Sequence, residues 1–163
     1  MRRRAKEMEV LAMKDLLTNL PNRKSFMVDM PNYLNWNSEG EYVGLLCINV
    51  DNFKQFNETF GHELGDVALI QLSRLISVNL ELEMLYRIGG DEFMLVMPKA
   101  KSVAQIAATA VKVMGLQAKH ANSQNRALAV QLSVGIAVYP KDAKTVIGLV
   151  KAADFALYCA KTR

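Results

Sequence analysis

Cysteine and histidine are scarce in this chain, which has two residues of each among its 163. Cys47 stands in an apolar segment and Cys159 in a helical one, a separation typical of reduced, structural thiols in the cytosol. His62 and His120 have no second histidine or cysteine at the spacing of a zinc site. We therefore expect neither a disulfide framework nor a zinc centre.

Long apolar runs are also missing. The longest, such as residues 43–48, are far too short to cross a bilayer, and Glu7 and Glu9 stand where a signal peptide would be apolar. We therefore expect a cytoplasmic chain with no membrane segment. Part of the net charge of +4 lies in a basic run at residues 2–6, and no basic stripe interleaved with aromatic residues follows it, so no nucleic-acid partner is expected.

The remaining composition is that of one globular domain, with 51% hydrophobic and 22% charged residues. Residues 42–50 (YVGLLCINV) form a continuous apolar run, which predicts a strand buried on both faces. Residues 128–138 alternate with period two and predict a second strand, broken or bulged near Gly135. Strands joined by hairpins and mixed with helical segments favour an α+β fold with a mostly antiparallel sheet.

Capping residues and apolar periodicity predict the helices and loops. Helices are expected over residues 2–16, from an Asn22 cap to Met30 with Pro31 ending or kinking it, from Asp66 as N-cap, after the capping box at 102–105 with Ile106, Ala110, Val111 and Met114 on one face, and from Thr145. Loops are expected at residues 35–40, 51–65 and 122–126.

Residues 85–97 (LYRIGGDEFMLVM) predict a β-hairpin with two carboxylates at its turn. Gly89 and Gly90 supply the positive φ values of a tight turn, so Asp91 and Glu92 are expected at a rigid tip. Two carboxylates there can converge on one Mg²⁺, which proteins often bind with a few carboxylates plus substrate phosphates. The alternative is a solvated turn without function.

Four motifs, in order, resemble those of the GGDEF family, the diguanylate cyclases. They are residues 15–23 (DLLTNLPNR), 49–66 (NVDNFKQFNETFGHELGD), 87–93 (RIGGDEF) and 153–161 (ADFALYCAK). The resemblance implies a five-stranded, mostly antiparallel sheet surrounded by helices, similar to the catalytic fold of nucleotide cyclases. It also implies a linker helix at residues 1–14 from an upstream sensory domain, and a domain at 15–163 whose C-terminal end is truncated.

In this family two domains meet as an antiparallel homodimer, and each GTP 3′-hydroxyl attacks the other GTP's α-phosphate to give cyclic di-GMP and two pyrophosphates. The resemblance implies Mg²⁺ or Mn²⁺ as the cofactor, held by Asn49, Val50, Asp91 and Glu92. Asp91 and Glu92 are the implied catalytic pair, with Asp91 as proton acceptor. The implied substrate-binding residues are Asn52, Phe53, Lys54, Asn57, Asp66, Gly89, Gly90 and Lys161.

Asn57 and Asp66 match the residues that read guanine, and Lys54 and Lys161 match lysines near the phosphates. Three of these side chains can equally have structural roles. Lys161 can be a solvated lysine at a helix C-terminus, Asn57 can serve its own loop, and Asp66 can be a helix N-cap.

Two departures from the family pattern bear on activity. Asn49 stands where the family usually has a metal-binding aspartate, so metal affinity is expected to fall. Residues 80–83 (LELE) replace the arginine-containing motif that grips the product, so no inhibitory site is expected. The alternatives are a regulatory module that binds GTP or a neighbouring domain, such as a downstream phosphodiesterase, and a cyclase that makes a 3′,5′-cyclic mononucleotide.

Overall fold

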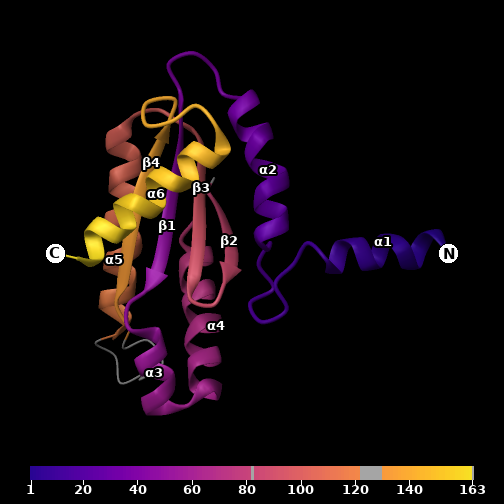
Figure 1. Cartoon of the computed structure of the whole chain (residues 1–163), viewed down its shortest axis with the longest axis vertical. Helices are drawn as coiled ribbons and strands as arrows, with labels where there is room; N and C mark the ends of the chain where they lie inside the picture. The colour runs from indigo at the N-terminus through magenta and orange to yellow at the C-terminus, as the bar shows by residue number, and fades with distance from the viewer. Residues whose placement is uncertain (82, 122–129, 163) are drawn as a thin grey trace.

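The computed structural model describes residues 1–81, 83–121 and 130–162, with residues 117–121 described by their backbone alone. Its sheet contains β1 (Tyr42–Val50), β2 (Met84–Gly89), β3 (Glu92–Ala100) and β4 (Leu132–Tyr139) in the order β2-β3-β1-β4 (Figure 1). Every neighbouring pair is antiparallel. The predicted α+β class is confirmed, with four strands in the described residues where the resemblance implied five.

Helices cover both faces of the sheet, and side chains of β1 alternate between two apolar clusters. Leu45 and Cys47 pack in the cluster that includes side chains of α2 (Arg23–Asn35) and α6 (Val146–Lys161). Leu46 and Ile48 pack in the opposite cluster, with α3 (Phe53–Phe60), α4 (His62–Val78) and α5 (Val103–Ala121). The prediction of a strand buried on both faces is therefore confirmed for β1.

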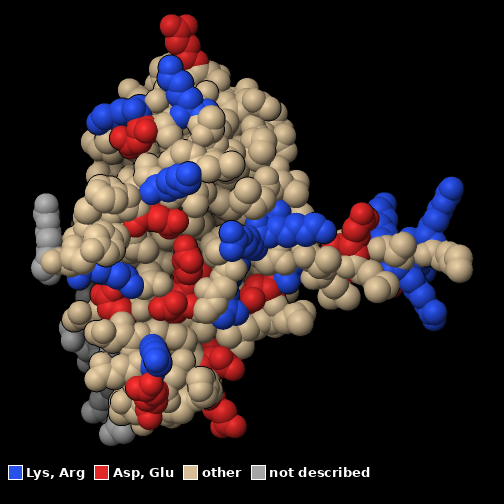
Figure 2. Space-filling model, in the orientation of Figure 1, with Lys and Arg blue, Asp and Glu red and all other residues tan. Residues whose placement is uncertain are grey.

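The N-terminal helix α1 (Arg2–Leu11) projects from this body (Figure 1), and none of its residues is buried. Figure 2 shows basic side chains at its outer end. No helix among the described residues combines the length and the apolarity that a membrane span requires.

The predicted loop at residues 51–65 is wrong, because this segment forms α3 and the first turn of α4. The predicted N-cap role of Asp66 is wrong for the same reason, since α4 begins at His62 and Asp66 lies within its second turn. Asn22 does cap α2 by accepting from Ser25 N, but Pro31 lies inside that helix, which continues to Asn35.

The apolar face predicted for α5 is only partly buried. Among the described side chains of this helix, Ile106, Ala110 and Val113 are buried, whereas Val111 is 66% exposed and Met114 37% exposed. The capping contact is confirmed, because Ser102 Oγ accepts from Gln105 N at 3.1 Å. Residues 122–126 and 128–129, for which a loop and the start of a strand were predicted, lie outside the described residues.

The break or bulge predicted near Gly135 is absent, because the register between β1 and β4 is continuous. Glycine is required there for another reason: a Cβ on Gly135 would overlap the backbone of Ala153 and Leu157 in α6. Helix α6 packs closely against β4 (Figure 1), and its last residue, Lys161, contacts Asn49 near the end of β1.

Candidate active site

The β2–β3 hairpin has the turn that the sequence predicted. Gly89 and Gly90 have φ values of 154° and 52°, a region that side chains with a Cβ rarely adopt. The Arg87 guanidinium stabilises the turn, because its Nη2 donates to the Gly90 carbonyl oxygen at 2.7 Å. Asp91 and Glu92 are therefore presented by a defined turn, and both are partly buried.

The end of β1 lies directly beside this turn. Asn49 is paired with Glu92 in the β1–β3 register, and Val50 N donates to the Asp91 carbonyl oxygen at 3.2 Å. The sheet thus brings together all four residues for which a metal-binding role was predicted, Asn49, Val50, Asp91 and Glu92. Their donor set of carboxylate, amide and carbonyl oxygens fits a hard divalent cation such as Mg²⁺ or Mn²⁺.

Lys161 reaches the same place from the last residue of α6. Its Nζ donates to Asn49 Oδ1, so an ammonium group occupies the amide oxygen that would face a cation. Lys161 therefore makes a specific contact with Asn49. The alternative interpretation, a lysine that is only solvated at a helix C-terminus, does not explain this contact.

Asn57 and Asp66 lie on two different helices, α3 and α4. The Asn57 side chain packs so closely against Gly65 that a Cβ there would overlap its Oδ1. That oxygen is buried and has no hydrogen-bond partner among the residues that the structure describes. A buried acceptor without a partner is energetically unfavourable. The alternative prediction, that the Asn57 side chain hydrogen-bonds within its own segment, is not supported at Oδ1. Asp66, the residue after Gly65, is exposed.

The turn between β1 and α3 contains Asn52, which adopts a left-handed conformation with φ 55° and ψ 33°. No described side chain caps the N-terminus of α3, so the first amide groups of the helix, those of Phe53 and Lys54, are available to an anion. A cavity of about 310 Å³ adjoins this turn, but among the predicted site residues only Asn52 lines it. Asn57 and Asp66 lie outside that cavity.

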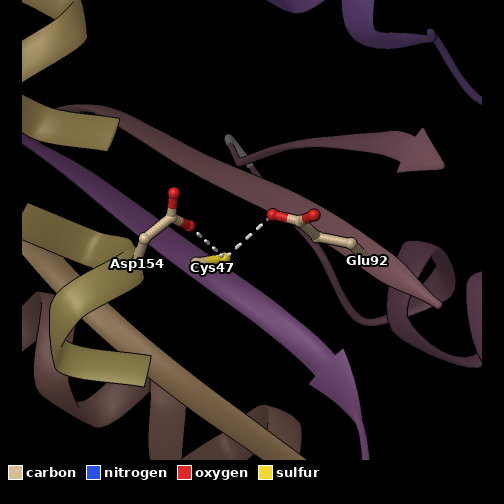
Figure 3. A group of neighbouring side chains, drawn as sticks. All are labelled: Cys47, Glu92 and Asp154. Atoms are coloured by element: carbon tan, nitrogen blue, oxygen red, sulfur yellow. Dashed lines mark hydrogen bonds between the residues drawn. The ribbon is translucent and has the colours of Figure 1, made fainter. Parts of the chain in front are cut away.

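Three side chains near the site were not predicted from the sequence. Asp51 accepts from Ser133 Oγ at 2.6 Å, a contact that joins the end of β1 to β4. Cys47 and Asp154 lie beside Glu92 (Figure 3), with Cys47 Sγ 3.4 Å from an oxygen of each carboxylate. Burial, and then the charges of Glu92 and Asp154, raise the pKa of the Cys47 thiol far above its usual value, so the thiol remains protonated.

Residues 12–163 match the family described as "Diguanylate cyclase, GGDEF domain". The chain belongs to the GGDEF family. Solved GGDEF domains also share its fold: the GGDEF domain of TpbB from Pseudomonas aeruginosa superposes with a TM-score of 0.82 at 32% identity, covering 91% of this chain and 88% of that one.

Curated proteins similar to this chain differ in their named activities. Diguanylate cyclase TpbB of Pseudomonas aeruginosa is 35% identical over 90% of this chain and 34% of its own length. Cyclic di-GMP phosphodiesterase PdeR of Escherichia coli is 34% identical over 98% of this chain and 24% of its own length. This GGDEF domain therefore spans about a third or less of these relatives, and the cyclases among them identify the general chemistry of the family.

Proposed function

We propose that this GGDEF domain is a diguanylate cyclase that condenses two GTP molecules into cyclic di-GMP and two pyrophosphates across an antiparallel homodimer. The observation that supports it most is the pairing of Asn49 with Glu92 and of Val50 with Asp91 at the end of the sheet. The same strand leads within three residues into the uncapped N-terminus of α3, so oxygen donors for a cation and amide donors for phosphates are neighbours in one segment.

The base of GTP would bind between α3 and α4. The Asn57 side chain has hydrogen-bonding capacity left, and the exposed Asp66 carboxylate can accept from guanine N1–H and N2–H. Gly65 is required because a larger residue would displace Asn57. This pair would therefore distinguish guanine from adenine, whose edge presents donors and acceptors differently.

The phosphates would extend from the α3 N-terminus toward the hairpin. Backbone amides of Phe53 and Lys54, together with Lys54 Nζ, are suited to the negative charge, and Gly89 and Gly90 expose the turn backbone without a Cβ. A bound Mg²⁺ or Mn²⁺ would neutralise charge that develops on the phosphates. Asp91 would accept the proton of the attacking hydroxyl. Lys161 would leave its contact with Asn49 and bind the terminal phosphate instead.

The test is incubation of the domain with GTP and Mg²⁺ or Mn²⁺, with the product identified by mass. We expect cyclic di-GMP, formed at a rate that rises more steeply than linearly with protein concentration, because one domain presents half of the reaction centre. The variant Glu92→Gln should lose the product while it still binds GTP. A 3′,5′-cyclic mononucleotide, or a strictly linear dependence on concentration, would contradict the proposal.

A specific observation also favours the second candidate, a regulatory module that binds GTP without turnover. Asn49 lacks the charge of a carboxylate, and its oxygen is engaged by Lys161. Bound GTP without product from both the wild-type domain and Asn49→Asp would support the module.

In either role we propose that residues 1–14 link the domain to an upstream sensory domain and that a phosphodiesterase domain can follow it. We also propose that the domain acts in the cytoplasm, where its two free cysteines stay reduced.

A further inference from the structure

Cys47 on β1 and Asp154 on α6 have no part in the reaction proposed above, yet both lie against Glu92. The Cys47 sulfur stands between the two carboxylates, 3.4 Å from Glu92 Oε1 and 3.4 Å from Asp154 Oδ1 (Figure 3). The three donor atoms lie within 4.8 Å of one another. The arrangement joins α6 to the acidic turn through a side chain of the central strand.

The Cys47 thiol can hold the Glu92 carboxylate in one direction. Cys47 is 0% exposed, so its position is fixed by the packed core around it. A neutral thiol has a single hydrogen, which it donates to one oxygen at a time. When it donates to Glu92 Oε1, no other described residue bonds Oε2, and that oxygen remains for a cation.

Asp154 places a second negative charge beside Glu92. No Lys, Arg or His of the described residues forms an ion pair with either carboxylate. Two like charges at this separation repel each other, and a cation that binds Glu92 removes part of the repulsion. Asp154 lies on α6, the helix whose Lys161 contacts Asn49, so the charge of Asp154 lies on the same side of the sheet as the uncharged Asn49 side chain.

We propose that Cys47 and Asp154 are positioning residues for Glu92: the thiol sets the direction of the Glu92 carboxylate, and the Asp154 carboxylate strengthens the binding of a divalent cation at the acidic turn. The inference rests on the proposed function, because it concerns the cation site of that reaction. Neither residue needs to contact the cation or the nucleotide.

The experiment measures Mn²⁺ binding rather than turnover. Free Mn²⁺ is titrated by electron paramagnetic resonance in the presence of the domain and a GTP analogue with a methylene bridge between the α- and β-phosphates. Asp154→Asn and Cys47→Ala should each weaken Mn²⁺ binding at least threefold. Cys47→Ser should restore most of the affinity, because its hydroxyl can donate to the same oxygen.

Matched controls separate positioning from general effects. Glu39→Gln removes one charge at an exposed residue before the opposite end of β1, and Cys159→Ala removes the other thiol; both should bind Mn²⁺ as the wild type does. The loss in Asp154→Asn should shrink at high salt, because it arises from charge. A purely structural effect would not depend on salt in this way.

Each outcome decides the inference. Wild-type affinity in Asp154→Asn, or a Cys47→Ser variant as weak as Cys47→Ala, would overturn it and leave the proposed function standing. Absence of nucleotide-dependent Mn²⁺ binding in the wild type would overturn both. If Cys47→Ala does not fold, Asp154→Asn still decides, because Asp154 is an exposed residue.

Discussion

Arg87 and Asp15 form an ion pair that joins the N-terminal segment of the domain to its acidic turn. Arg87 Nη1 lies 2.9 Å from Asp15 Oδ1 and 3.0 Å from Oδ2, while Nη2 of the same guanidinium donates to Gly90 O. The backbone reinforces the contact, because Arg87 N donates to the Pro21 carbonyl oxygen at 2.9 Å. A movement of the segment that follows α1 would therefore displace Arg87 and, through it, the turn that carries Asp91.

The Asp15→Asn variant should be less stable and should lose part of the acid dependence of stability. Burial alone would raise the pKa of Asp15, but hydrogen bonds from Thr18 and then the Arg87 guanidinium outweigh it and hold the pKa below its ordinary value. The wild-type contribution is therefore present above about pH 3.9, the ordinary pKa of aspartate, and is lost as the pH falls through the lower pKa of the folded state.

Urea unfolding of wild type and Asp15→Asn between pH 3 and 7 measures this contribution. We expect a loss of about 1–3 kcal/mol near pH 7, the usual effect of removing a charged hydrogen-bond partner from a partly buried site. The difference between the two proteins should narrow toward pH 3. A difference that does not change with pH would show that the ion pair is not its source.

The Gly65→Ala variant should bind GTP poorly while remaining folded. The added Cβ would overlap Asn57 Oδ1, so the side chain proposed to read guanine must turn away. We expect an affinity at least about tenfold lower, equivalent to about 1.4 kcal/mol, by calorimetric titration with the non-reactive analogue. Gly61→Ala is unsuitable as a control because of its positive φ of 90°. Glu58→Gln, an exposed change on α3, should have little effect.

Glycine at position 135 should be required for stability, whereas glycine at position 115 should not. Gly135→Ala would press a methyl group into the backbone of α6, and we expect a loss of at least about 1–3 kcal/mol, as for an overpacked core. Gly115 lies in α5 with no atom near its would-be Cβ, so Gly115→Ala should raise stability by about 0.5–1 kcal/mol. Thermal unfolding of the two variants checks both signs.

The Asn49→Asp variant should bind Mg²⁺ more tightly. An added carboxylate at a cation site gains Coulomb energy of at least about 1 kcal/mol at 4 Å, so an increase of about fivefold or more is expected. Lys161 would pair with the new charge and reduce the gain, which predicts a larger effect in the double variant with Lys161→Ala. An unchanged Mg²⁺ affinity in both would show that residue 49 does not face the cation.

Elements governed by local apolar pattern could be predicted from the sequence, and those governed by distant contacts could not. The strand at residues 42–50 could be predicted with its observed bounds, because a run buried on both faces is apolar at every position. The α3 helix was missed although Phe53, Phe56 and Phe60 recur at helical spacing, because the segment is only eight residues long and its other five residues are polar or charged. A glycine within a strand indicates either a bulge or a close approach, and only the packing of α6 decides for Gly135.

The candidate site divides in the same way. Asp91 and Glu92 could be predicted, since glycines adjacent in sequence mark the turn that carries them. The contact between Cys47 and Asp154 joins residues 107 positions apart, so no local pattern could reveal it. Asp154 did stand within one of the four motifs, which was the available signal, but its partner Cys47 lies in a strand whose apolar pattern indicated only burial.

A GTP site in this domain requires that the acidic turn and the α3–α4 guanine pair face one nucleotide. Nuclear magnetic resonance of the domain with Mn²⁺ and the non-reactive GTP analogue tests this most directly, because the bound ion broadens signals of nearby amides. We predict that the amides of Gly89 to Glu92 and of Asn52 to Lys54 broaden, and that those of Asn57 and Asp66 shift on binding the nucleotide. Broadening at the turn without any shift at Asn57 and Asp66 would contradict a shared site.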